Sequence, residues 1–172
     1  ELDLLAELVP SPGHQVIELG CGAARMAQQM LKRWPGLRYV GLEVDAIQHA
    51  RNLQAPAAGM RFVAAGAQGI PCGDAQFDLA LMLKSLHHVP LAAMDQALAE
   101  VARVLRPGGY LYVSEPVYAG PLNEIVRLYN DEGLVRAAAQ AAVDRALAAP
   151  DSPWQHAAER RFDMPVQFSD FA

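Results

Sequence analysis

Short apolar runs alternate with amphipathic stretches over the first two thirds of the chain. Five of these runs are predicted to be strands: residues 15–19, 38–42, 60–64, 77–83 and 110–114. They show little polar alternation, which is typical of strands that are buried on both faces, as in a parallel sheet.

Helical spacing of apolar residues fills the gaps between the strands. Helices are predicted over residues 2–9, 23–34, 46–53 and 91–105. The last is the clearest, because Met94, Leu98 and Val101 fall on one face. This alternation predicts an α/β fold, a Rossmann-like doubly wound sheet that is mostly parallel and carries helices on both faces. Ligands bind such a sheet beyond the carboxyl ends of its strands.

The pattern changes after Glu115. An Ala-rich stretch, about residues 122–147, is predicted to be helical, and its apolar side chains indicate a lid over a small organic acceptor. Those side chains are Ile125, Leu128, Tyr129, Leu134 and Val135. We therefore divide a single domain into a core, residues 1–118, and a helical lid or substrate segment, residues 119–172. Residues 161–168 alternate, and Pro165 would confine a strand there to a sheet edge.

Composition narrows the class of protein. The chain has 172 residues, enough for one domain, with 52% hydrophobic residues and no apolar run long enough to span a membrane. Its net charge of -5 disfavours a nucleic-acid partner. The two cysteines, Cys21 and Cys72, form neither a disulfide framework nor a Cys-x-x-Cys pair, which favours a reducing cytoplasm.

Both ends of the sequence suggest a piece of a longer protein. The chain starts at Glu1 without an initiator Met and stops at Ala172 without a helix cap, so we expect the natural protein to continue past Ala172. If it does end there, the exposed sheet edge must be covered by the tail or by a second copy in a homodimer.

A glycine turn between the first strand and the first core helix is the strongest motif. Gly20 and Gly22 let the backbone approach a ligand closely. Glu18, two residues earlier, would repel a pyrophosphate and attract a cation, and Arg25 stands where a dinucleotide site has its third glycine. The loop therefore favours S-adenosylmethionine, which is cationic and has no phosphate, over a nicotinamide dinucleotide.

A second carboxylate follows the second strand. Glu43 lies 21 residues after Gly22, the spacing at which an acid accepts hydrogen bonds from both ribose hydroxyls. Asp45 is a competitor for that role, but its position favours an N-cap for the next helix.

In order along the chain, these blocks resemble the small-molecule class I methyltransferases, especially those related to ubiquinone and menaquinone biosynthesis. The matching blocks cover about residues 15–116 and are residues 16–22, 39–43, 77–80, 86–89 and 103–109. The resemblance implies S-adenosylmethionine as cofactor and a small-molecule methyl acceptor. It also implies a cofactor site made of Glu18, Gly20, Cys21, Gly22, Glu43, Val44, Gly66, Ala67, Gln68 and Leu83.

In that family Glu18 would orient the loop and the methionine amine, and the Leu83 carbonyl would accept from the ammonium. This sequence departs from the family at two positions. Ala24 replaces a third glycine, and Gly66 replaces the aspartate that meets the adenine amino group. Backbone groups of Ala67 or the amide of Gln68 could substitute there, at a loss on the order of 1.5 to 3 kcal/mol of cofactor binding.

Two histidines after the fourth strand are the candidate catalytic groups. His88, and less so His87, could act as a base toward a hydroxyl acceptor, although packing beside the cofactor is the simpler interpretation. We predict no metal at the pair, because neighbours on an extended chain point apart and no third ligand is close in sequence. Two other functions stay open: a repurposed domain that binds S-adenosylmethionine without transfer, and an NAD(P)-dependent oxidoreductase.

Overall fold

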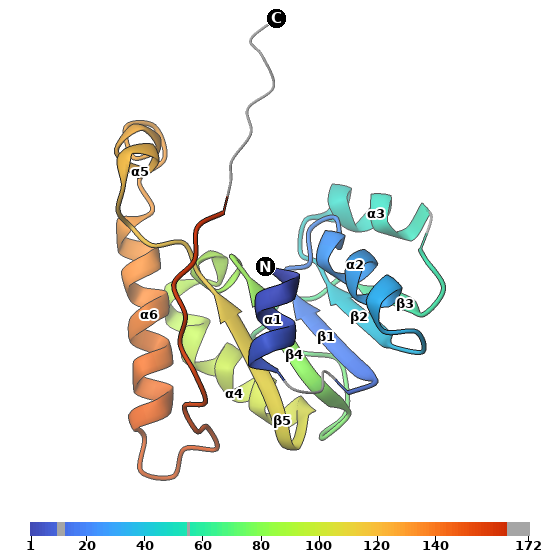
Figure 1. The fold of residues 1–172 in the computed structure, drawn as a ribbon. Helices are drawn as coiled ribbons and strands as arrows, with labels where there is room; N and C mark the ends of the chain where they lie inside the picture. Colours follow the sequence, from blue (N-terminus) through green and yellow to red (C-terminus); the bar gives the residue numbers. More distant parts are fainter. Residues whose placement is uncertain (10–12, 55, 165–172) are drawn as a thin grey trace, which may run out of the picture.

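A single parallel sheet forms the centre of the molecule (Figure 1). The computed structural model describes residues 1–9, 13–54 and 56–164. The strands are β1 (Gln15–Leu19), β2 (Arg38–Leu42), β3 (Met60–Val63), β4 (Phe77–Leu83) and β5 (Leu105–Ser114). Their order is β3-β2-β1-β4-β5, and every neighbouring pair is parallel. The doubly wound α/β prediction is thus confirmed. The winding reverses between β1 and β4, where a ligand crevice is expected.

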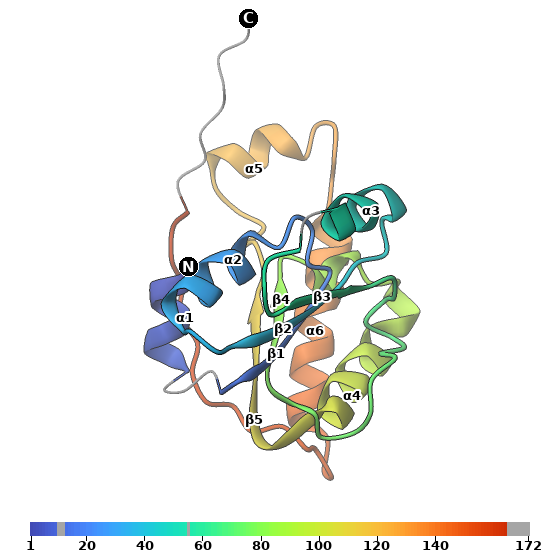
Figure 2. The same ribbon diagram turned by 90° about the vertical axis from the view of Figure 1, so that its right-hand side faces the viewer.

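Helices cover both faces of this sheet (Figure 2). They are α1 (Leu2–Leu8), α2 (Arg25–Arg33), α3 (Ala46–Gln54), α4 (Met94–Val104), α5 (Pro121–Val126) and α6 (Gly133–Ala148), with 3-10 turns η1 (Leu86–His88) and η2 (Leu91–Ala93). α1 and α2 lie on one face of the sheet, and α4 and α6 lie on the other.

Alternation along the strands builds two apolar cores. Val16 of β1 packs with the α1 and α2 side chains, whereas Ile17 packs with the α4 and α6 side chains. Both residues are fully buried. This two-sided burial is the reason why the strands read as continuous apolar runs.

The fifth strand starts earlier than the sequence pattern predicts. Phe77 pairs with Leu105 while Leu79 pairs with Tyr110, so residues 106–109 bulge out of β5 instead of forming a turn before it. Gly108 has a φ of +79°. Pro-Gly-Gly suits a turn and a bulge equally well, and the pairing with β4 decides between them.

The Ala-rich stretch is two helices, not the one that the pattern predicts. α5 ends at Val126 and α6 begins at Gly133, whose N–H donates to Asp131 Oδ1 over 2.9 Å. α6 belongs to the helical layer of the core, because Ala139 and Ala142 are completely buried in it. α5 projects from the body of the fold (Figure 1). The proposed lid therefore reduces to α5 and its flanking loops.

The final described segment has no regular structure after residue 154. The strand predicted over residues 161–168 is absent from residues 161–164, and the rest of it lies outside the described residues. Residues 152–164 run alongside β5 in both views (Figures 1 and 2). Among the described residues, no helix has the length and apolar character needed to cross a membrane.

The carboxylate of Asp78 connects β4 to β1 and β5 at the end of the sheet that lies away from the glycine turn. Asp78 Oδ2 accepts the backbone N–H groups of His14 and Gln15, each over 2.9 Å, and Oδ1 pairs with Arg106. Burial acts to raise the pKa of Asp78, but these hydrogen bonds outweigh it and hold the pKa below its usual value. The carboxylate therefore stabilises the fold above its ordinary pKa, and this contribution is lost as the pH falls through the lowered value.

Replacing Asp78 with Ala is expected to lower the free energy of unfolding by about 2–3 kcal/mol, because two backbone donors and a guanidinium lose their acceptor. Denaturant unfolding measures this change. The matched control is Asp95→Ala, which breaks an exposed pair with Arg145 and should cost no more than about 0.5 kcal/mol. Equal losses in the two variants would contradict the role given to Asp78.

Candidate functional site

The glycine turn lies at the carboxyl end of β1, beside the end of β4. Gly20 has a φ of +73°, and a Cβ at Gly20 would come within 2.9 Å of the Cβ of Ser85. Ser85 in turn donates from Oγ to the Leu19 carbonyl over 2.6 Å. Ala24 stands in the left-handed region, with a φ of +52°, at the position where the family has its third glycine. Ala24 therefore adopts a left-handed conformation that glycine adopts more readily.

Glu43 connects the glycine turn to the start of α3. Its Oε2 accepts the Gly22 N–H over 2.8 Å and its Oε1 accepts the Asp45 N–H over 2.8 Å, while 7% of the residue is exposed. Asp45 caps α3 by accepting the N–H groups of Ile47 and Gln48. The two acids thus have different tasks, and Glu43 is the one that faces the glycine turn.

Glu18 is buried under the turn and bonded to a residue that sequence reasoning did not single out. Tyr39 donates from its hydroxyl to Glu18 Oε2 over 2.6 Å. Burial raises the pKa of Glu18 to about 7, although the Tyr39 hydrogen bond opposes part of this rise. Burial also raises the pKa of Cys21 to about 12, so its thiol stays protonated and is not a nucleophile.

The loop after β3 carries the candidate adenine contacts. At Gly66 a Cβ would lie 2.5 Å from Gln68 Oε1, so the Gln68 amide occupies the space of a side chain at that position. The Gln68 carbonyl accepts from Gln96 Nε2 over 2.8 Å, which ties the loop to α4. Val44 is 72% exposed at the end of β2. An amide therefore stands where the family has a carboxylate.

The two histidines differ in environment. His87 is buried and its Nδ1 bonds to Glu115 Oε2, while Glu115 Oε1 accepts the Leu86 N–H over 2.9 Å. His88 is exposed. The better-held imidazole is that of His87, whereas the sequence argument preferred His88. Glu115 reaches His87 because β5 and β4 end side by side, and the two residues follow those strand ends.

One premise used against a metal at this pair is wrong, and the other does not decide the question, because the third potential ligand is close in space and not in sequence. His87 and His88 lie in the 3-10 turn η1, not on extended chain, and their ring centroids are 4.1 Å apart. A third potential ligand comes from the N-cap residue of α6, since Glu132 Oε2 lies 4.0 Å from His87 Nε2. Ligand atoms of the three residues all lie within 4.8 Å of one another.

Glu132 is itself held in place. Arg136 donates from Nη2 to Glu132 Oε2 over 2.6 Å and from Nη1 to Asn123 Oδ1 over 3.1 Å. Burial acts to raise the pKa of Glu132, but Arg136 outweighs it and the pKa lies below its usual value. Sequence reasoning missed both residues, because nothing local links a helix start at residue 132 to a turn at residue 87.

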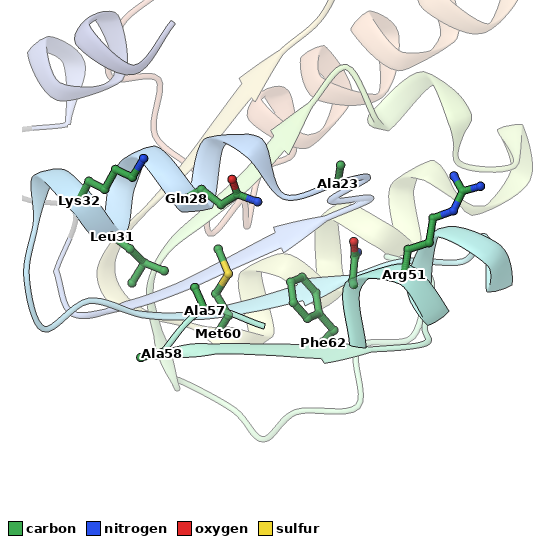
Figure 3. A pocket seen from close by; sticks show the side chains of 10 residues that line it. Ala23, Gln28, Leu31, Lys32, Arg51, Ala57, Ala58, Met60 and Phe62 are labelled. Atoms are coloured by element: carbon green, nitrogen blue, oxygen red, sulfur yellow. The ribbon is translucent and has the colours of Figure 1, made fainter. Parts of the chain in front are cut away.

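Asn52 is a further residue that the sequence did not reveal. It donates from Nδ2 to the Gly22 carbonyl over 2.8 Å and so fastens α3 to the glycine turn. Asn52 also lines a hollow of about 430 Å³ between α2, α3 and β3, with Leu31 and Phe62 among its walls (Figure 3). Neither Glu43 nor His87 lines this hollow, so we do not assign the cofactor to it.

Comparison with known proteins identifies the family. Residues 17–113, more than half of the chain, match the family model described as a methyltransferase domain. The fatty-acid O-methyltransferase of Mycolicibacterium smegmatis is 38% identical over 105 residues, which are 60% of this chain and 37% of that protein. The chain spans less than half the length of the curated relatives that it matches.

Solved structures agree on the fold. The cyclase SpnF is 29% identical with a TM-score of 0.59, covering 70% of this chain and 45% of that one. CalS10, an amino pentose methyltransferase from Micromonospora echinaspora described with SAM bound, is 24% identical with a TM-score of 0.56 and covers 67% and 48% of the two chains. The glycine turn, Glu43 and the histidine pair all lie within the matched residues. The chain belongs to the methyltransferase domain family and has its Rossmann-like fold.

Proposed function

We propose that this chain is the S-adenosylmethionine-binding part of a methyltransferase that acts on a small organic molecule. The observation that carries this proposal is the position of Glu43, whose two carboxylate oxygens are held between the Gly22 N–H and the Asp45 N–H. A carboxylate fixed beside a glycine turn suits a ribose diol, and its charge suits a cationic ligand.

The remaining cofactor residues follow from their positions. Glu43 would accept hydrogen bonds from the ribose, and exposed Val44 would pack against the adenine. Gly66, Ala67 and Gln68 would bound the adenine edge. Gly20, Cys21 and Gly22 would pass under the methionyl part, with Glu18 and the Leu83 carbonyl toward its ammonium.

When bound, S-adenosylmethionine supplies a methyl group that its sulfonium already activates. The protein's tasks are to align the acceptor opposite the S–CH3 bond and to keep the reacting atoms dry. In the transfer the S–CH3 bond breaks, an O–CH3 bond forms and the acceptor proton leaves. We take an oxygen acceptor as the first choice, because the relative from Mycolicibacterium smegmatis is named an O-methyltransferase.

We propose that His87 and His88 promote loss of that proton. Glu115 fixes the His87 ring through Nδ1, which directs Nε2 away from β5, and His88 is accessible. Replacing either histidine with Asn should lower turnover about 100-fold and leave S-adenosylmethionine affinity within about threefold. Unchanged turnover in both variants would remove the pair from the mechanism.

The activity is tested directly with methyl-labelled S-adenosylmethionine and a panel of fatty acids, phenols and sugar alcohols. We expect label in at least one oxygen acceptor and a stoichiometric amount of S-adenosylhomocysteine. Binding without transfer to any acceptor, by the full-length protein as well, would favour the repurposed domain. SpnF, which is named a cyclase, shows that this fold serves more than one reaction.

A nicotinamide dinucleotide is the other cofactor to exclude. Glu18 and Arg25 disfavour a pyrophosphate, and the family match is to a methyltransferase domain. Titration should therefore show binding of S-adenosylmethionine and none of NADH. Tight NADH binding would overturn the proposal.

The finer proposals on setting and assembly are a cytoplasmic location and a homodimer. Free thiols at Cys21 and Cys72 support the first. β5 is an edge strand of the sheet formed by the described residues, and the second proposal rests on the side of β5 that pairs with no strand among them. Sedimentation of the full-length protein tests the dimer.

Gln68 is the residue expected to compensate for the missing carboxylate at position 66. Gln68→Ala should weaken S-adenosylmethionine binding about fivefold by removing an amide contact, worth about 1 kcal/mol. Gly66→Asp should strengthen it about tenfold, because a charge-assisted bond replaces a neutral one. Gln96→Ala, which alters only the support of the loop, is the control, and calorimetry gives the affinities. Unchanged affinity in Gln68→Ala, or weaker binding by Gly66→Asp, would contradict this assignment.

A further inference from the structure

We propose that His87, His88 and Glu132 form a binding site for a divalent transition-metal ion. Two imidazoles from η1 and one carboxylate from the start of α6 meet here with their ligand atoms within 4.8 Å of one another. This donor set is the one that zinc hydrolases and non-haem iron sites use, with coordination positions left open.

The support around His87 is the second observation that favours an ion. Histidines that bind metals almost always donate their other ring N–H to a carboxylate, which fixes the tautomer and the direction of the free nitrogen. His87 Nδ1 bonds to Glu115 Oε2, and Glu115 is itself anchored by the Leu86 N–H over 2.9 Å. With Nδ1 on the Glu115 side, Nε2 is the ring nitrogen that faces Glu132, and it lies 4.0 Å from Glu132 Oε2.

The distance between His87 Nε2 and Glu132 Oε2 is only slightly longer than the distance between two ligand atoms on one metal ion. An ion with bonds of about 2.0–2.1 Å places tetrahedral ligand atoms about 3.4 Å apart. His87 and Glu132 are therefore within about 0.6 Å of the required spacing. His88 is exposed, so its ring is free to turn toward the ion.

The local charge also suits a cation. Glu115 and Glu132 are carboxylates, and Arg136 is the one guanidinium bonded to this cluster within the described part of the chain. The charges of Glu115, Glu132 and Arg136 together give one negative charge. Arg136 also orients Glu132, and the buried Asn123 beside it keeps an Nδ2 group that has no partner among the described residues. A polar donor is thus left over for an oxygen ligand near the ion.

This site would connect the core to the segment that follows it. His87 and His88 come from the turn after β4, where the acceptor is expected, and Glu132 is the N-cap residue of α6. An ion here would fix α6 over the acceptor end of the crevice. The two histidines would then promote proton loss through the ion, as a Lewis acid on the acceptor oxygen, and not by accepting the proton themselves. That role rests on the proposed function, but binding of the ion does not.

The test is a titration of chelator-treated, full-chain protein with Co²⁺, followed by its visible absorption and by competition with Zn²⁺. We expect one ion per chain and a higher melting temperature when the ion is bound. His88→Ala and Glu132→Gln should each lower the Co²⁺ affinity at least about tenfold, and both should keep the circular dichroism of the wild type. His156→Ala, which replaces an exposed histidine that is not a member of this cluster, is the matched control and should bind as the wild type does.

Absence of stoichiometric binding, or binding that survives both substitutions, would overturn the inference. S-adenosylmethionine binding and methyl transfer by metal-free protein are measured in the same preparations. Transfer by a protein that binds no ion would remove the metal site and leave the proposed function standing. Co²⁺ binding that both substitutions weaken, in a protein that transfers no methyl group, would support the site and count against the function.

Discussion

Replacing Glu43 with Gln is expected to weaken S-adenosylmethionine binding about 100-fold, or about 3 kcal/mol. Glu43 presents acceptors to two backbone N–H groups, those of Gly22 and Asp45. An amide in its place turns an N–H₂ group against one of these donors and removes the charge that, by our proposal, would face the ribose. Isothermal titration calorimetry at constant pH measures the loss.

Asp45→Asn is the matched control for this prediction. Asp45 lies two residues from Glu43 and accepts the N–H groups of Ile47 and Gln48. Asn is as good an N-cap, so the variant loses one nearby negative charge and little helix stability. Its affinity should stay within about threefold of the wild type. If Glu43→Gln also binds within threefold, the ribose assignment is incorrect.

Most of the sheet could be predicted from sequence because its burial is two-sided. β2 and β4 have the predicted bounds, because the mostly apolar runs at 38–42 and 77–83 are interrupted only by Arg38 and Asp78 near their starts. The predicted strand 110–114 is shorter than β5, because Pro-Gly-Gly is equally typical of a turn before a strand and of a bulge within one. The break between α5 and α6 was missed, because helix propensity alone does not show where tertiary contacts end a helix.

Within the candidate site, too, contacts set by local spacing could be predicted and contacts set by tertiary packing could not. Glu43 and Gly22 are paired by a fixed spacing around one β-α-β unit, so their meeting could be inferred from the motif. His87 and Glu132 are brought together only by the packing of α6 against η1, which no local pattern records. Tyr39 was read as an ordinary strand residue, and its bond to Glu18 depends on the register of β1 with β2.

The affinity for S-adenosylmethionine should rise with pH and then level off, because Glu18 must lose a proton to face a cation. Burial raises the pKa of Glu18 to about 7 in the free protein; Tyr39 and Lys84 oppose this rise, and Glu1 and Glu43 add to it. A bound sulfonium and ammonium lower that pKa again. Below about pH 7 binding then releases a proton, and affinity falls by up to about tenfold per pH unit. Above about pH 7 the affinity does not change with pH.

Glu18→Gln separates this effect from other titrations, since Gln keeps an acceptor for Tyr39 but cannot ionise. The pKa of Cys21, about 12, puts that thiol outside the same range. Calorimetry at about pH 6 in buffers of different ionisation enthalpy should count nearly one proton released by the wild type and none by the variant. The folded protein also binds the Glu18 proton more tightly than the unfolded chain does. Its stability should therefore decrease as pH rises from about 4.5 to about 7, and Glu18→Gln should remove this slope. Equal proton release by both proteins would show that Glu18 does not face the cofactor's positive charge.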